Sequence, residues 1–398
     1  MKTRRSGSEY VCPALVSAGF MALALGSVGC SSSEGSGDTR TEKLDQAQST
    51  FVDEKGRTWI KLGEAKFTDE GTETRKPIEP LSERSLDEII MEVSLEEAAR
   101  MLQPHLEFDG VEYTISDKDA LEFAQMVRER IKQGGIADVK SEIPEGAKVL
   151  DGDAEGDELE GRKIIPGYGD WYRINSSAHI WPYSMVATLD QGAGRCTAFK
   201  IVNHYTAATA GHCVASSSGN WKARQRIQFA AGSGNTGSSG SGDEKGYLPS
   251  GCYGRVTPGC FSGVGQCDYA VFYLRGAHGG NAAWCNFNDY NVGYFGALGV
   301  GSGDTGVQTR MGSYPGSPPT GGYPSLYYHN RSDGWASGDH LRYRIDTLPG
   351  SSGAPTFNSA QQVRSVHNDA CGSGSCTYNY GMRMTTAMYS FMEAYGGI

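Results

Sequence analysis

The sequence predicts an all-β fold for residues 164–398, preceded by a small, acidic region rich in helix. One observation is charge: residues 31–163 carry 33 acidic and 18 basic side chains, whereas residues 164–398 carry 12 and 15. A second is pattern, because short apolar runs separated by Gly, Ser and Pro are typical of sandwiches and barrels. The clearest of these runs are SMVATL, RIQFAA, YAVFYLR and LRYRID.

The first thirty residues have the layout of a secretory signal. MKTRR is followed by an apolar stretch and by Cys30, which precedes Ser- and Gly-rich sequence. Cys30 after SVG also resembles a lipoprotein cleavage site, although Ser27 stands where an aliphatic residue is usual. A soluble secreted protein and one first held in the cell envelope by a lipid at Cys30 therefore both stay open. No other membrane contact is expected.

Residues 31–163 are expected to form a polar tether, a helical acidic region and a linker. Ser94 and Glu97 in SLEEAARML have the spacing of a capping box. The stretch SDKDALEFAQMVRERIKQGG has helical apolar spacing and ends at two glycines. The strip 151–163, DGDAEGDELEGRK, is nearly all charge and glycine and should be exposed to proteases. We expect residues 31–163 to be a removable propeptide that inhibits the remainder.

Eight cysteines lie between Cys196 and Cys376, an even number that indicates disulfides formed outside the cytosol. Cys196 with Cys213 is the pairing we expect first, and the local pair Cys371 with Cys376 second. The pairing of the remaining four is left open by the spacing. No paired CxxC stands among them, so neither a zinc site nor any other cofactor is expected.

Three polar positions in the β-rich part suggest chemistry. His212 ends an apolar stretch directly before Cys213, and Asp268 begins an apolar strand. Two adjacent serines, Ser351 and Ser352, lie in the run DTLPGSSGAPTFN. Each alone is explained by a turn or a strand end. Together they offer a base, an orienting carboxylate and a nucleophile, the three roles of a serine-hydrolase triad.

Residues 164–398 resemble the bacterial branch of the chymotrypsin-like serine proteases, and most closely the glutamyl endopeptidases. TAATAGHC, DYAV and PGSSGAP are similar to that family's histidine, aspartate and GxSG motifs, in the family's order. The resemblance implies two six-stranded antiparallel β-barrels with the site between them. It implies that Ser352 is the nucleophile, and that the N–H groups of Gly350 and Ser352 form the oxyanion hole.

The resemblance leaves substrate specificity divided. Thr347 and His367 are similar to the residues that bind a substrate carboxylate in glutamyl endopeptidases, which implies cleavage after Glu. Asp346 lies six residues before Ser352, where trypsin-like enzymes hold the carboxylate that binds Arg or Lys. The Glu reading requires Asp346 to turn away from the pocket, since two carboxylates repel.

We expect a secreted, monomeric serine endopeptidase, made as a zymogen, that acts on proteins or peptides. An inactive protease-like binding module is the alternative from another class, and loss of a triad residue would favour it. A separate partner-binding role for the acidic region also stays open. Nucleic-acid binding is not expected, because the balance of +3 in residues 164–398 is small and shows no basic run.

Overall fold

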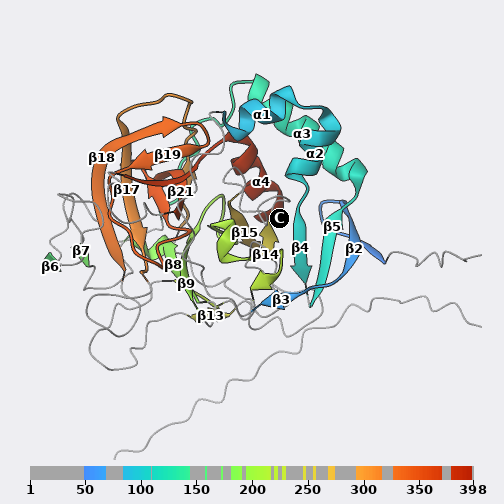
Figure 1. The fold of residues 1–398 in the computed structure, drawn as a ribbon, viewed down its shortest axis with the longest axis horizontal. Helices are drawn as coiled ribbons and strands as arrows, with labels where there is room; N and C mark the ends of the chain where they lie inside the picture. The colour runs from blue at the N-terminus through green and yellow to red at the C-terminus, as the bar shows by residue number, and fades with distance from the viewer. Residues whose placement is uncertain are drawn as a thin grey trace, which may run out of the picture. The chain divides into compact units, whose positions relative to one another are not determined.

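The computed structural model shows two β-structures and an α/β module that packs against them (Figure 1). Residues Gln48–Ile398 form one unit. The described residues are 49–68, 84–108, 110–143, 157–158, 172–173, 181–190, 194–216, 219–222, 226–229, 245–247, 254–256, 268–273, 293–315, 326–369 and 378–396.

Six strands of the C-terminal half close into a barrel. Their order is β17–β20–β21–β22–β19–β18, and β18 pairs back to β17. The short strands β7 (Tyr172–Arg173) and β6 (Asp157–Glu158) continue from β18, and β16 (Gly296–Ala297) pairs with β21. The barrel strands are β17 (Val307–Ser313), β18 (Tyr327–Ser337), β19 (His340–Tyr343), β20 (Pro355–Phe357), β21 (Gln362–Asp369) and β22 (Asn379–Arg383).

The second β-structure holds seven strands described in the C-terminal part, in the order β14–β15–β10–β9–β8–β12–β13. A further strand, β11 (Trp221–Lys222), pairs with β3 (Phe67–Thr68) in a separate two-stranded sheet. Their bounds are β8 (Val186–Asp190), β9 (Arg195–Lys200), β10 (Thr206–Thr209), β12 (Arg226–Phe229), β13 (Lys245–Tyr247), β14 (Gly254–Val256) and β15 (Ala270–Tyr273). The strands read from SMVATL, RIQFAA, YAVFYLR and LRYRID are β8, β12, β15 and β19, so the all-β prediction is confirmed.

We call residues 49–143 the N-terminal module; its described residues, 49–68, 84–108 and 110–143, form three helices and five strands. The helices are α1 (Leu86–Glu92), α2 (Leu95–Leu102) and α3 (Asp117–Lys132). The strands are β1 (Thr50–Val52), β2 (Thr58–Glu64), β3 (Phe67–Thr68), β4 (His105–Phe108) and β5 (Val111–Ile115). The predicted helices are present, and the strands were not foreseen.

The helix starts follow from local capping. The Ser94 side chain accepts from the Glu97 N–H as predicted, and Ser116 caps α3 in the same way. The reciprocal capping box, however, lies one helix earlier, at Ser85 and Glu88. Helix α3 ends before Gly134 and Gly135, both at positive φ, where the sequence predicted its end.

One hydrophobic core runs through the module and the second β-structure. Trp59, Leu102 and Val127 of the module belong to the same buried cluster as Phe199, Val271 and Phe391. The last helix, α4 (Thr386–Gly396), contacts α1 and α3 on the module side and β10 and β15 on the other (Figure 1). Among the described residues, no helix is long and apolar enough to cross a membrane.

Candidate active site

Pairing of β10 with β15 brings His212 and Asp268 together. The strands run antiparallel, with Thr209 opposite Ala270. His212 follows the end of β10 in a short 3₁₀ turn, Gly211–Cys213, and Asp268 precedes the start of β15. Because one strand ends where its antiparallel neighbour begins, the two side chains meet at the same edge of the sheet.

Asp268 holds the His212 ring through both carboxylate oxygens. Its Oδ2 lies 2.8 Å from His212 Nδ1, and its Oδ1 accepts from the His212 backbone N–H at 2.8 Å. Both residues are buried, with 7% and 3% of their surfaces exposed. An ionised carboxylate in this position fixes the proton on Nδ1 and leaves Nε2 as the basic nitrogen.

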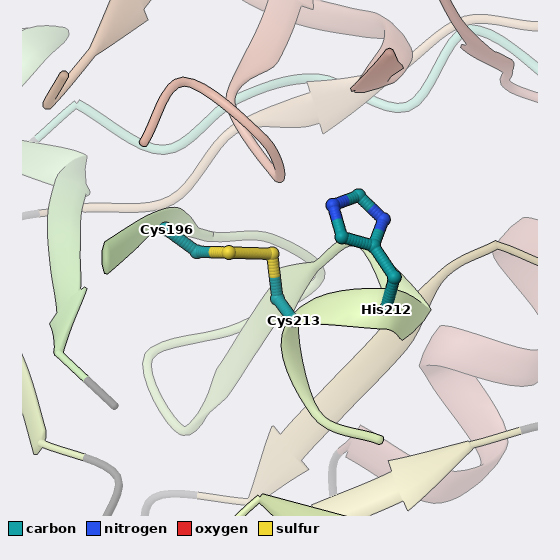
Figure 2. Close-up of side chains that lie close together, drawn as sticks. All are labelled: Cys196, His212 and Cys213. Atoms are coloured by element: carbon teal, nitrogen blue, oxygen red, sulfur yellow. A yellow bond between two sulfur atoms is a disulfide. The ribbon is translucent and has the colours of Figure 1, made fainter. Parts of the chain in front are cut away.

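A disulfide joins β9 to the turn that carries His212. Cys196 and Cys213 are bonded, with their Cα atoms 6.1 Å apart, and both are buried. Figure 2 shows the bonded sulfurs beside the His212 ring. Cys196, His212 and Cys213 lie close enough to suggest a metal site. A sulfur committed to a disulfide is not a thiolate ligand, so the disulfide itself explains this grouping.

Ser352 lies in a turn that packs against β9. Thr197 of β9 donates through its N–H to Ser352 O at 2.7 Å, and through its Oγ1 to Gly350 O at 2.9 Å. Cys213 Sγ lies 3.7 Å from Ser352 O. The turn of Ser352, which comes from the other β-structure, therefore lies against Cys213, the residue that follows His212.

The two serines of the turn differ in environment. Ser351 is fully buried, and its Oγ donates to Ser313 Oγ at 3.2 Å. Ser352 is partly exposed. Within the part of the chain that the structure describes, the N–H groups of Gly350 and Ser352 donate to no protein acceptor. Ser351 thus has a structural partner, whereas the groups around Ser352 remain open to a ligand.

Gly353 is required by the close approach of this turn to β9 and β10. It has a φ of +85°, and a Cβ built on it would lie 2.1 Å from both Thr197 O and Thr209 Oγ1. Real Cβ atoms do not approach other atoms so closely. The last glycine of the GxSG motif therefore allows the barrel turn to contact the other β-structure.

His367 faces the same region from β21. Its backbone N–H donates to Ala354 O at 2.8 Å, and its carbonyl accepts from the Gly353 N–H at 2.6 Å. The Tyr343 hydroxyl lies 2.6 Å from His367 Nδ1, and Tyr380 O lies 3.1 Å from it. Burial and the neighbouring His212 lower the pKa of His367 to about 3, so the ring is neutral at pH 7.

Thr347 and Asp346 are both buried, each with 1% of its surface exposed. Thr347 Oγ1 accepts from Asn379 Nδ2 at 2.9 Å, and the same amide nitrogen donates to Ile345 O at 2.7 Å. An acceptor bond from Asn379 leaves the Thr347 hydroxyl proton available to another partner.

Sequence reasoning missed Thr197, Tyr343 and Asn379. Tyr343 and Asn379 are opposite one another in the β19–β22 pair, and Thr197 follows Cys196. Each contacts a predicted residue that lies far away in the sequence. Of these three residues, only Thr197 could have been found from the sequence, because it directly follows Cys196 of the predicted disulfide.

Several predictions fall on residues outside those described. They concern the signal 1–30 with Cys30, the linker 151–163 apart from Asp157 and Glu158, and the pair Cys371 and Cys376. The remaining four cysteines, Cys252, Cys260, Cys267 and Cys285, also lie outside the described residues.

No protein-family model and no curated protein matches this chain. Solved structures do match. One titled as a Glu endopeptidase in complex with MPD is 24% identical, with a TM-score of 0.46, and the match covers 58% of this chain and 98% of that one. The protease Anisep from Arthrobacter nicotinovorans is 20% identical, with a TM-score of 0.37, over 52% and 93% of the two chains. The thermostable serine protease AL20 from an extremophile is 19% identical, with a TM-score of 0.37, over 53% and 96%.

Substitution of Gly353 by Ala should destabilise the protein by several kcal/mol, because it adds steric overlap at 2.1 Å to the strain of a positive φ. Gly303→Ala is the matched control, since Gly303 has a φ of +83° and nothing lies within 4 Å of its Cβ position. That variant should lose only about 1–2 kcal/mol from the strain. The free energy of unfolding in urea measures both, and equal losses would contradict the close approach.

Proposed function

We propose that this protein is a secreted serine endopeptidase that cleaves peptide bonds after Glu through His212, Asp268 and Ser352. The observation that carries the proposal is the buried pair of His212 and Asp268 next to the turn of Ser352. In this proposal His212 is the base, Asp268 the orienting carboxylate and Ser352 the nucleophile.

The chemistry requires each of these groups. Ser352 Oγ attacks the carbonyl carbon of the substrate while its proton passes to His212 Nε2, and Asp268 stabilises the imidazolium that forms. The C–N bond then breaks as His212 returns the proton to the leaving amine, which gives an acyl-enzyme. Water activated by the same imidazole hydrolyses the ester and restores Ser352.

The negative oxygen of each tetrahedral intermediate needs fixed donors. The N–H groups of Gly350 and Ser352 are suited to this role, because no protein acceptor among the described residues occupies them. The peptide unit between these two donors is held on both sides, because Thr197 Oγ1 donates to Gly350 O and the Ser351 N–H donates to Leu348 O, each at 2.9 Å. Such preorganised donors supply a large share of catalysis in acyl transfer.

Preference for Glu is supported by the surroundings of His367. A neutral imidazole donates from only one nitrogen. Two groups contact Nδ1: the Tyr343 hydroxyl at 2.6 Å, which can donate to it, and Tyr380 O at 3.1 Å, which can only accept from it. The proposal takes the shorter contact as the hydrogen bond, with Tyr343 donating, which puts the His367 proton on Nε2. His367 Nε2–H and the Thr347 hydroxyl then offer two donors to a substrate carboxylate. Hydrogen bonds to a charged acceptor are about twice as strong as neutral ones.

Synthesis as a precursor is the remaining part of the proposal. The acidic strip 151–163 precedes the protease-like part of the chain and contains both Glu160 and Arg162. Cleavage after Glu160 would suit self-processing, and cleavage after Arg162 would need another protease. The α-ammonium set free by the cut would add a positive charge that helps to bind the substrate carboxylate.

Ser352→Ala should abolish peptide hydrolysis, because it removes the acyl-accepting oxygen and leaves the turn intact. Ser351→Ala should retain most activity, since the Ser351 hydroxyl is fully buried and bonds to Ser313 Oγ and the Leu348 N–H. Hydrolysis of fluorogenic Glu peptides measures both variants, with circular dichroism as the check on folding. Loss of activity in Ser351→Ala with retention in Ser352→Ala would show that the nucleophile is misassigned.

His367→Ala should lower kcat/KM for Glu peptides by about 10- to 100-fold and for peptides with an apolar residue at that position far less, since the loss is that of a bond to a charged group. Similar losses of kcat/KM on the Glu and the apolar peptides in His367→Ala would mean that His367 has only a structural role.

Tyr343→Phe removes the hydroxyl that orients the His367 ring and should lower kcat/KM for Glu peptides about 10-fold. A wild type that prefers Arg or Lys would make Asp346 the binding carboxylate instead.

A further inference from the structure

Helix α4 is buried on almost every side. Its sequence, TAMYSFMEAYG, is largely apolar, and nine of its eleven residues are buried. A helix that is apolar all round needs partners on all faces. One face packs on the second β-structure, where Phe391 forms an edge contact with Tyr269, the ring centroids 5.4 Å apart. The β-rich part therefore buries one side of α4, and another part of the chain must bury the opposite side.

The N-terminal module covers that other side, chiefly through Arg130 of α3. Its guanidinium donates to Glu393 at 2.6 Å and to Ser390 at 3.2 Å, and it lies 5.2 Å from the centre of the Tyr389 ring. Tyr389 and Ser390 lie four and three residues before Glu393, so each is its neighbour on the helix surface. Arg130 of the module contacts all three.

The module also supplies partners for both ends of α4. Asp87 accepts from the first backbone N–H groups of the helix, those of Thr386 and Ala387, each at 2.8 Å. At the other end, Lys55 and Arg57 donate to the carbonyl of Ala394, at 3.1 Å and 2.7 Å. An anion at the N-terminus and cations at the C-terminus match the helix dipole. The module thus binds groups at both ends of α4, in addition to the cap that Thr385 Oγ1 gives the Met388 N–H.

Backbone contacts extend the same interface. Strand β4 of the module pairs with β14, and Val139 exchanges two hydrogen bonds with Ala297, at 3.1 Å and 3.0 Å. The chain passes so close to Gly296 that a Cβ there would lie 2.0 Å from Val139 O and 2.6 Å from Ser141 N. Only glycine at this position of β16 admits the module.

We propose that the N-terminal module stays bound to residues 164–398 after the acidic strip is cut, as a second chain that completes the fold of the mature protein. The proposal uses the cut described under the proposed function but not its catalytic chemistry. The contacts above lie at α4, β14 and β16, and neither His212, Ser352 nor His367 takes part in them. In this proposal the described part of the module is a docked subunit, which differs from the removable inhibitor expected from the sequence.

The test is to cut the purified full-length protein in the strip 151–163 and ask whether the two fragments separate. A trace of an added Glu-specific protease makes the cut even if the protein itself has no activity. Size-exclusion chromatography with mass spectrometry then identifies the fragments in each peak. Coelution of the module with the larger fragment at micromolar concentration is expected, and elution of a folded larger fragment alone would overturn the proposal.

Two pairs of variants connect the result to this interface. Gly296→Ala should raise the dissociation constant of the cut complex at least tenfold, and Gly299→Ala should not, since nothing lies within 4 Å of a Cβ at Gly299. Asp87→Ala should also raise it about tenfold, whereas Asp117→Ala, an exposed acid in the first turn of α3, should not. Unchanged association in both Gly296→Ala and Asp87→Ala would contradict the proposed interface. Coelution without hydrolysis would leave it standing and contradict the proposed catalytic function alone.

Discussion

The contact of Thr197 with the turn of residues 350–353 is the constraint on which the site depends. Thr197 belongs to β9, whereas the turn belongs to the closed barrel, and two hydrogen bonds from one residue join them. The N–H of Tyr314 also donates to Thr197 Oγ1, at 2.9 Å, so the hydroxyl is held from both sides. This contact ties the turn of Ser352 to the strand that the disulfide joins to the turn of His212.

Two other features keep this contact in place. The disulfide between Cys196 and Cys213 joins the residue before Thr197 to the residue after His212. The absence of a side chain at Gly353 lets the turn approach β9 and β10. The disulfide, Thr197 and Gly353 together hold the turn of residues 350–353 against β9 and the end of β10. Preorganisation of this kind is what nucleophilic catalysis by serine requires.

The sequence predicted the local features of the protein and missed the nonlocal ones. The cap at Ser94, the end of α3 before Gly134 and the strands of the β-rich part follow from short-range patterns. The role of Tyr343 does not, because it depends on a neighbour on β21 that the sequence places 24 residues away. The strands of the N-terminal module were missed for a related reason: β4 has only four residues and is stabilised by pairing with β5 and β14.

Labelling with an organophosphorus fluoridate tests the central claim most directly. Such a reagent forms an Oγ–P bond, with loss of fluoride, at a serine that an adjacent imidazole activates. Mass spectrometry of the digested protein then locates the phosphorus. The account predicts a single label on Ser352, none on Ser351, and no label when His212 is replaced by Ala. A label on another serine, or labelling of Ser352 that is unaffected by His212→Ala, would contradict it.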